Sequence, residues 1–160
     1  VLSASISGIS KSSAGKAGSL NGYFKDENLG TLTKNTSIGI FGRPEENYSF
    51  KQKQIEVAET DEIKVGKASI YTTISQNDVE EYEIEITRIC NKSKDSNENI
   101  IIKITDERLI DECGGIVQGM SGSPIIQNGK LIGAITHVIV SEPKKGYAVF
   151  AETMLEISEN

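Results

Sequence analysis

The sequence predicts a mainly β protein, and three observations support this fold class. The apolar side chains are mostly isoleucine, valine and leucine, with no tryptophan, and β-branched side chains favour strands. Several segments alternate apolar and polar residues with period two, as half-buried strands do. An Asn128-Gly129 pair separates two apolar runs, which is a strong hairpin signal. A chain of 160 residues fits one domain, residues 1–160, that can bury a core.

The first part of the chain is expected to begin with a flexible stretch. Residues 1–22, which include "ISKSSAGKAGSLNG", are rich in small and polar residues, so they predict a surface loop or linker that precedes the packed domain. Gly30, Gly39 and Gly42 then divide short apolar pieces at tight turns, and Pro44 ends that series.

The middle of the chain predicts three strands. Period-two alternation covers residues 52–59, 63–74 and 79–89. "SQND", at 75–78, joins the second and third of these as a hairpin turn, and "NKSKDSNEN", at 91–99, predicts a solvated loop.

The last part alternates strands with two short helices. "IIIKI", at 100–104, predicts a strand, and residues 105–115 predict a helix with a Thr or Asp cap and glycines at its end. Residues 123–140 predict a hairpin, residues 147–150 a strand, and residues 151–157 a closing helix.

Composition argues against several classes of partner. The formal net charge is -6, whereas affinity for nucleic acid or anionic lipid comes from clustered Lys and Arg. No apolar run approaches the length of a membrane helix, and the opening residues lack a signal-peptide layout. We therefore expect no nucleic-acid partner. Since the sequence begins at Val1, we also expect it to be a piece of a longer chain.

The two cysteines indicate neither a disulfide framework nor a zinc site. Cys90 and Cys113 have no second Cys or His at zinc-ligand spacing. Both are interpreted as buried small apolar residues rather than as a disulfide bridge. We expect no metal and no organic cofactor.

The stretch "IVQGMSGSPII" contains the candidate nucleophile. A serine hydroxyl attacks a carbonyl only when a base takes its proton and nearby N–H groups stabilise the oxyanion. Glycines beside Ser121 allow the N–H groups of Gly119 and Ser121 to point at one spot, while Pro124 starts the next strand. The stretch resembles the "G-x-S-G-x-P" nucleophile loop of chymotrypsin-like serine peptidases. A plain Gly/Ser/Pro turn between strands is the alternative interpretation.

A wider stretch narrows the resemblance to one family. "GGIVQGMSGSPIIQNGKLIGAITHVIV", with "GYAVFAETML" after it and "GTLTKNTSIGIFG" and "ITDERLI" before it, resembles the peptidase domain of the stage IV sporulation protein B family. This resemblance implies a chymotrypsin-like double β-barrel, with the C-terminal barrel nearly complete here and the N-terminal barrel partial. It also implies a serine endopeptidase of endospore formers, with a PDZ domain and a membrane-targeting segment upstream.

The resemblance further implies where the enzyme works and on what. Family members are secreted from the forespore into the space between the two membranes, cleave themselves, and cut a regulator of an intramembrane protease to trigger sigma factor activation. The expected partners are therefore protein or peptide substrates, with membrane association only through upstream segments.

The general base is the open question of the sequence. Family members carry a "G-H-x-I" histidine upstream of the region that begins at Val1, so the resemblance implies Ser121 as nucleophile, Asp106 as acid, and a histidine outside this chain. These residues alone would then be inactive. A rival set uses His137 as base and Asp106 to orient it, but an unbroken ladder from the Asn-Gly turn would place Ser121 opposite Thr136 and point His137 away. His137 is otherwise a substrate-binding or a structural residue.

Three further alternatives remain for the roles of these residues. Asp106 is explained equally well as a helix cap, and Ser123 is a weaker nucleophile candidate because a proline follows it. The chain could also be a catalytically dead, peptidase-like domain that binds peptides. A small β-barrel interaction module would place Ser121 away from any cleft.

Overall fold

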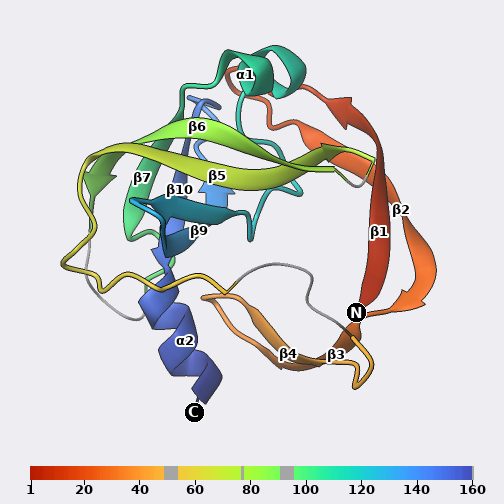
Figure 1. Cartoon of the computed structure of the whole chain (residues 1–160). Coiled ribbons are helices and arrows are strands. Elements are labelled where there is room, and N and C mark those ends of the chain that lie inside the picture. The colour runs from red at the N-terminus through yellow and green to blue at the C-terminus, as the bar shows by residue number, and fades with distance from the viewer. Residues whose placement is uncertain (49–53, 77, 91–95, 160) are drawn as a thin grey trace.

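A closed barrel of six strands forms the core of the computed structural model, which describes residues 1–48, 54–76, 78–90 and 96–159 (Figure 1). In chain order the elements are β1 (Leu2–Ser10), β2 (Ser19–Asn28), β3 (Gly30–Asn35), β4 (Ile40–Pro44), β5 (Gly66–Ser75), β6 (Asp78–Ile89), β7 (Ile100–Ile104), α1 (Glu107–Cys113), β8 (Pro124–Gln127), β9 (Lys130–Val138), β10 (Lys145–Phe150) and α2 (Ala151–Glu159). The barrel order is β10, β7, β6, β5, β8, β9, while β1–β2 and β3–β4 form separate two-stranded sheets.

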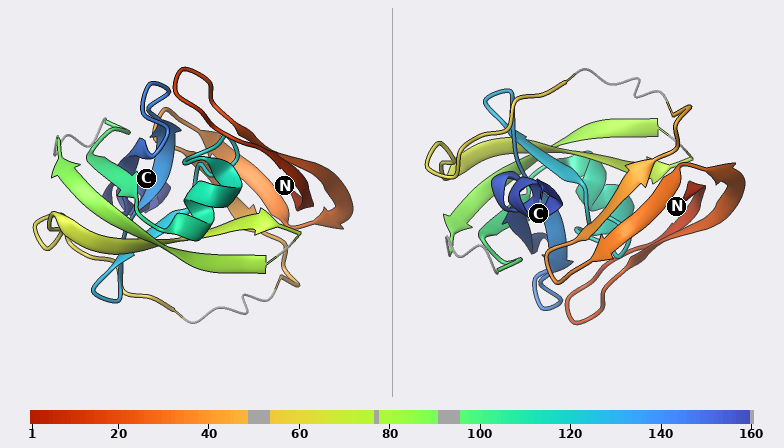
Figure 2. Two further views of the ribbon diagram at one scale, coloured as in Figure 1. Left: turned by 90° about the horizontal axis from the view of Figure 1, so that it is seen from above. Right: turned by 90° about the horizontal axis from the view of Figure 1, so that it is seen from below.

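This arrangement confirms the predicted fold class. The C-terminal barrel, β5 to β10, closes, and the described residues of the N-terminal part form two hairpins, β1–β2 and β3–β4. The β1–β2 hairpin stands beside the barrel in each view, and α1 and α2 lie at opposite ends of the barrel in Figure 1 (Figures 1 and 2). The protein is mainly β and consistent with a chymotrypsin-like fold whose N-terminal barrel is partial.

The barrel core follows from the period-two pattern. On β6 the side chains of Tyr82, Ile84 and Ile86 are buried, while the glutamates between them face outward. On β7, Ile100 and Ile104 are fully buried at the two ends of the strand. A fully buried isoleucine contributes about 1.5–3 kcal/mol relative to an exposed one, so these rows supply much of the free energy that holds the barrel closed.

Local signals place both helices and the last hairpin where they were predicted. Asp106 caps α1, and Gly114 ends this helix in the left-handed region with φ of 75°. In the β8–β9 turn, Asn128 and Gly129 have φ values of 52° and 79°, as a two-residue hairpin turn requires. The Asn-Gly prediction is therefore confirmed.

The expectation of a surface loop or linker over residues 1–22 is wrong for most of this segment, because β1 and β2 begin at Leu2 and Ser19 and only residues 11–18 form the turn between them. Ile9 pairs with Leu20 where β1 and β2 meet, and the Ser12 side chain between these strands is buried. The Ser12 hydroxyl donates to the Ile116 carbonyl at 2.8 Å and accepts from the Gly18 N–H at 2.8 Å. The small and polar residues of this segment suggested a loop. Their hydrogen-bond partner Ile116 lies about a hundred residues later in the chain, so a local sequence pattern does not reveal the contact.

Two other expectations need correction. The strand expected over residues 52–59 does not form over the described residues of that range. There the Ala58 N–H donates to the Leu131 carbonyl, and the Leu131 N–H donates to the Glu56 carbonyl, as an isolated bridge beside β9.

Cys90 is exposed, although Cys113 is buried as expected, and both thiols are free. Residues 52, 53 and 91–95 lie outside the described residues, so the predictions for these positions are not compared with the structure.

The two N-terminal hairpins leave large apolar side chains exposed. Phe24 on β2 is 78% exposed, and Tyr23, Leu32 and Ile40 are exposed as well. An incomplete N-terminal barrel is expected to leave such faces and strand edges uncovered. Within the described ranges, no helix has the length and apolar character needed to cross a membrane.

Replacement of Ser12 tests whether the N-terminal segment packs against the barrel. Ser12→Ala leaves the Ile116 carbonyl and the Gly18 N–H without their buried partner, so we expect a loss of about 1–3 kcal/mol in the free energy of unfolding. The matched control is Ser13→Ala, because Ser13 is exposed. Urea unfolding measures both variants, and equal stabilities would contradict the buried contact.

Candidate functional site

Residues 114–123 form a loop between α1 and β8, and this loop carries the candidate nucleophile. Met120 is completely buried, whereas Gly119 and Ser121 on either side of it are exposed. The Ser123 N–H donates to the Met120 carbonyl at 3.0 Å, which closes a tight turn around Ser121. The buried methionine thus anchors the loop and holds its neighbours at the surface.

Left-handed glycines allow this shape. Gly119 has φ of 104° and Gly122 has φ of 89°, a region that other residues rarely adopt. A Cβ added at Gly119 would also lie only 3.1 Å from the Leu20 side chain. The glycines identified in the sequence therefore have a backbone role in the loop.

The start of β2 fixes the loop from one side. The Gln118 N–H donates to the Gly18 carbonyl at 2.9 Å, and the Leu20 N–H donates to the Gln118 carbonyl at 2.8 Å. These two bonds form a short parallel bridge directly before Gly119. Sequence reasoning missed this support because it treated residues 9–22 as a loop.

Strand β9 fixes the loop from the other side. The Gly122 N–H donates to the Ile135 carbonyl at 2.8 Å, and the Ser121 hydroxyl donates to the Thr136 carbonyl at 2.8 Å. A carbonyl oxygen accepts this proton but is too weak a base to remove it. The hydroxyl of the candidate nucleophile is thus positioned by Thr136 without being activated by it.

Two amide groups in the loop have no acceptor among the described residues. Among the hydrogen bonds of the described residues, none has the N–H of Gly119 or of Ser121 as its donor. Both residues are exposed. Free amides beside a serine hydroxyl are what an oxyanion hole requires.

Ser123, the weaker candidate, is buried, with 9% of its surface exposed. Its hydroxyl donates to the Thr72 hydroxyl on the neighbouring strand β5 at 3.0 Å. A buried and paired hydroxyl cannot reach a substrate, so the geometry favours Ser121.

Ser121 opens into a cavity of about 420 Å³. The cavity is bounded by the β3–β4 turn, by β9 and by α2, and its lining residues are Asn35, Thr36, Ser37, Ile38, Gly39, Ile40, Asn97, Ser121, Gly122, Ala134, Ile135, Thr136, His137, Val149 and Met154. The volume falls within the range of pockets that bind small groups. The alternative of a small β-barrel interaction module predicted Ser121 away from any cleft, and this prediction is wrong.

His137 lines the same cavity as Ser121 and is exposed. An unbroken β8–β9 ladder, which would point His137 away from Ser121, does not form, because a bulge between Ile125 and Ile126 shifts the pairing by one residue. In the described parts of the chain no hydrogen bond joins His137 to Ser121. Ser121 and His137 thus share a cavity without a hydrogen bond between them.

Asp106 lies at the N-cap of α1 rather than in this cavity. Its carboxylate accepts from the Arg108 N–H at 3.0 Å and from the Glu83 N–H at 3.2 Å, and it pairs with the Arg108 guanidinium at 2.8 Å. The Arg108 side chain is the main cause that lowers the pKa of Asp106, with burial opposing it. No hydrogen bond within the described ranges joins Asp106 to Ser121 or His137.

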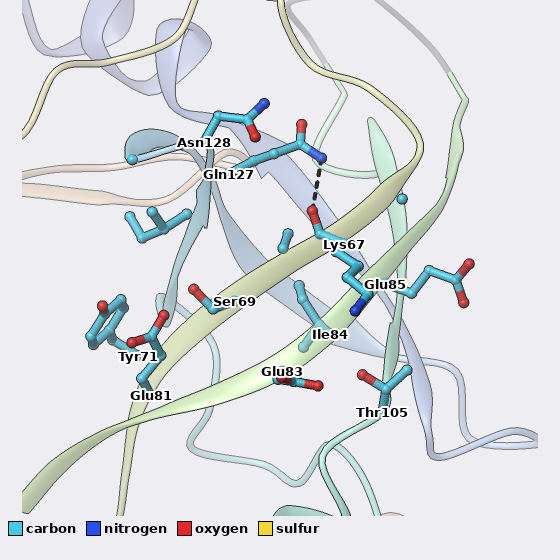
Figure 3. A pocket seen from close by; sticks show the side chains of 14 residues that line it. Lys67, Ser69, Tyr71, Glu81, Glu83, Ile84, Glu85, Thr105, Gln127 and Asn128 are labelled. Carbon is cyan, nitrogen blue, oxygen red and sulfur yellow. Dashed lines mark hydrogen bonds between the residues drawn. The ribbon is translucent and has the colours of Figure 1, made fainter.

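A second cavity lies on the outer face of the barrel. It has a volume of about 760 Å³ and is lined by β5, β6 and the β8–β9 turn (Figure 3). Glu81, Glu83 and Glu85 face it from β6, opposite Tyr71 and Lys67 on β5 (Figure 3). None of the predicted site residues lines this larger cavity, whereas Ser121 and His137 line the smaller one.

The buried cysteine and the acidic residues do not form a further centre. Burial raises the pKa of the Cys113 thiol to about 11, so this thiol stays protonated and unreactive at neutral pH. In the portion of the chain that the structure describes, no group of three or more His, Cys, Asp and Glu side chains is placed to hold a metal ion.

Asp106 variants separate a capping role from a catalytic one. Asp106→Ala removes the cap and its ion pair, so we expect a loss of about 0.5–2 kcal/mol in the free energy of unfolding. Because folding lowers the pKa of Asp106, this stabilisation is present above the ordinary carboxyl pKa and disappears as the pH falls through the lowered value. Unfolding measured at a series of pH values checks both points.

Asp106→Asn is the matched variant, because asparagine caps helices about as well as aspartate. We expect it to keep most of the stability at neutral pH. A stability loss in Asp106→Asn as large as that in Asp106→Ala would contradict the capping role. If Asp106→Asn stays folded but abolishes cleavage by the intact protein, the carboxylate acts in catalysis as well.

Comparison with known proteins is informative at the level of the family. Residues 1–155 match the family model described as SpoIVB peptidase S55. A search of the curated proteins found no match. Since the family match spans nearly the whole chain, including the closed barrel and the serine loop, the chain belongs to the SpoIVB peptidase S55 family, whose members are sporulation serine peptidases.

Proposed function

We propose that this chain carries the nucleophile of a serine endopeptidase that cleaves proteins through an acyl-enzyme. Family membership supports a peptidase. The observation that carries the assignment to Ser121 is the position of its hydroxyl at a cavity, beside the N–H groups of Gly119 and Ser121 that lack acceptors.

The proposed reaction follows from this arrangement. The Ser121 oxygen attacks the substrate carbonyl while its proton passes to a general base, and the two free amides receive the negative charge of the oxyanion. Collapse of the tetrahedral intermediate releases the amine, which takes the proton from the base. Water then attacks the ester and regenerates the Ser121 hydroxyl.

The general base is proposed to be a histidine outside these 160 residues, as the family resemblance implies. The Ser121 hydroxyl donates to a carbonyl, and this carbonyl cannot act as its base. The one histidine of the chain, His137, is not bonded to Ser121. The chain alone is then inactive, and Asp106 serves as the acid only if its cap contacts rearrange in the intact protein.

The biological setting is likewise a proposal from the family. The intact protein, with an upstream PDZ domain, is secreted from the forespore into the intermembrane space and cleaves itself. It also cuts a regulator of an intramembrane protease, which triggers sigma factor activation. The net charge of -6 supports protein substrates over nucleic acid, and membrane association is assigned to upstream segments.

A catalytically dead peptide-binding domain is the second candidate. It is favoured by the hydrogen bond from Ser121 to the Thr136 carbonyl, because an unactivated serine can line a binding cleft without reacting. The same cavity would then hold a peptide without cleaving it.

Replacement of Ser121 separates the two candidates. Ser121→Ala removes the nucleophilic oxygen, so we expect self-cleavage of the intact protein to fall below detection. Ser123→Ala is the control and should keep cleavage, since the Ser123 hydroxyl is buried against Thr72. Intact mass spectrometry over time measures both. No cleavage by the unmodified protein would favour the binding domain, whereas cleavage that persists in Ser121→Ala would rule out Ser121 as the nucleophile.

Labelling by a fluorophosphonate tests the location of the base. The 160-residue chain should not react at Ser121, because no described base is bonded to its hydroxyl. In the intact protein, His137→Ala should keep cleavage within a few-fold of the unmodified rate. Strong labelling of the chain that disappears in His137→Ala would instead make His137 the base.

A further inference from the structure

We propose that the cavity beside Ser121 is the specificity pocket of the enzyme and that it selects a large, uncharged, apolar side chain of the substrate. This inference rests on the proposed function and names the substrate class for the same site. It is carried by the chemistry of the lining residues and by the way in which the pocket wall is attached to the nucleophile strand.

The lining of the pocket is neutral. Of the described residues that border it, none is Asp, Glu, Lys or Arg. Apolar surface comes from the β3–β4 turn through Ile38, from β9 through Ala134 and Ile135, and from α2 through Met154. Transfer of an unpaired charge into such a site is costly, while apolar burial is favourable.

The wall opposite Ser121 has a defined shape. Thr36 closes the β3–β4 turn, because its hydroxyl donates to the Gly39 carbonyl at 3.1 Å and accepts from the Ile38 N–H at 3.2 Å. Ile38 is 6% exposed, so it is packed rather than mobile in solvent. Gly39 contacts Met154, since an added Cβ would lie 3.1 Å from the Met154 Cε.

Hydrogen bonds tie this wall to the strand that positions Ser121. The Thr136 carbonyl accepts from the Ser121 hydroxyl, and the Thr136 hydroxyl donates to the Asn97 carbonyl at 2.7 Å. The Asn97 side-chain amide in turn donates to the Ser37 carbonyl at 2.8 Å. A side chain in the pocket is therefore held between a fixed wall and the nucleophile.

Size supports a large side chain. The volume of about 420 Å³ is larger than a small side chain needs. Among the described lining residues, the polar side chains carry amide, hydroxyl or imidazole groups. Leucine, methionine and phenylalanine fit this chemistry, whereas aspartate and lysine would lose hydration without gaining an opposite charge.

Binding to the inactive protein tests the pocket independently of catalysis. The intact protein with Ser121→Ala is titrated by calorimetry with blocked hexapeptides of alanine in which the fourth residue is Leu, Phe, Asp or Lys. We expect the Leu and Phe peptides to bind at least about tenfold more tightly than the Asp and Lys peptides. Equal affinities, tighter binding of a charged peptide, or no binding of any peptide would overturn the proposal.

Charge substitutions in the cavity wall then test whether the selected side chain of the peptide binds in this cavity. Met154→Asp should strengthen binding of the Lys peptide and weaken that of the Leu peptide, so that the ratio of the two affinities shifts at least about tenfold. Leu155→Asp is the matched control, because Leu155 is exposed on the same helix and does not line the cavity. An equal shift in both variants would overturn the proposal.

A second position protects the test against misfolding of the α2 variant. Ile40 lines the cavity at its rim and is 59% exposed, so Ile40→Asp should fold, and the same shift toward the Lys peptide is expected. Leu32→Asp, on the paired strand β3, is its control. Cleavage assays decide the proposed function separately: a protein that cleaves through Ser121 but shows no peptide preference would refute the pocket alone.

Discussion

The hydrogen bonds between the first strands and the serine loop are the constraint on which the site depends. Ser12 and Ile116 are 104 residues apart in the chain, yet the Ser12 hydroxyl bonds the Ile116 carbonyl in a buried position. The bridge between Gly18 and Gln118 then continues this contact to the residue before Gly119. A glycine-rich loop has many conformations open to it, and these bonds select the one that leaves the loop amides free.

A single irregularity in the β8–β9 hairpin changes the strand register near Ser121. The bulge at Ile125 shifts the ladder by one residue, and in a strand such a shift moves every later side chain to the other face. Beyond this bulge, β9 provides the Thr136 carbonyl that accepts from the Ser121 hydroxyl.

Local patterns predicted the barrel because period-two alternation, the Asn-Gly turn and the Asp106 cap act over a few residues. The serine loop was likewise recognisable from its glycines. The contacts of Ser12, Asn97 and Met154 could not be predicted, since each depends on partners that only the folded chain brings together. The assigned roles of Ser121, Asp106 and His137 stay predictions, because their geometry is compatible with both candidate functions.

The attachment of the serine loop to both halves of the chain also has a consequence for biosynthesis. The Ile116 N–H donates to the Pro143 carbonyl at 2.8 Å, so the loop needs a partner that leaves the ribosome after the loop itself. Contacts between segments that are distant in the sequence form more slowly than local ones. A nascent chain that ends before Pro143 lacks this bond, so the serine loop of a stalled or truncated product is held by fewer partners than that of the complete domain.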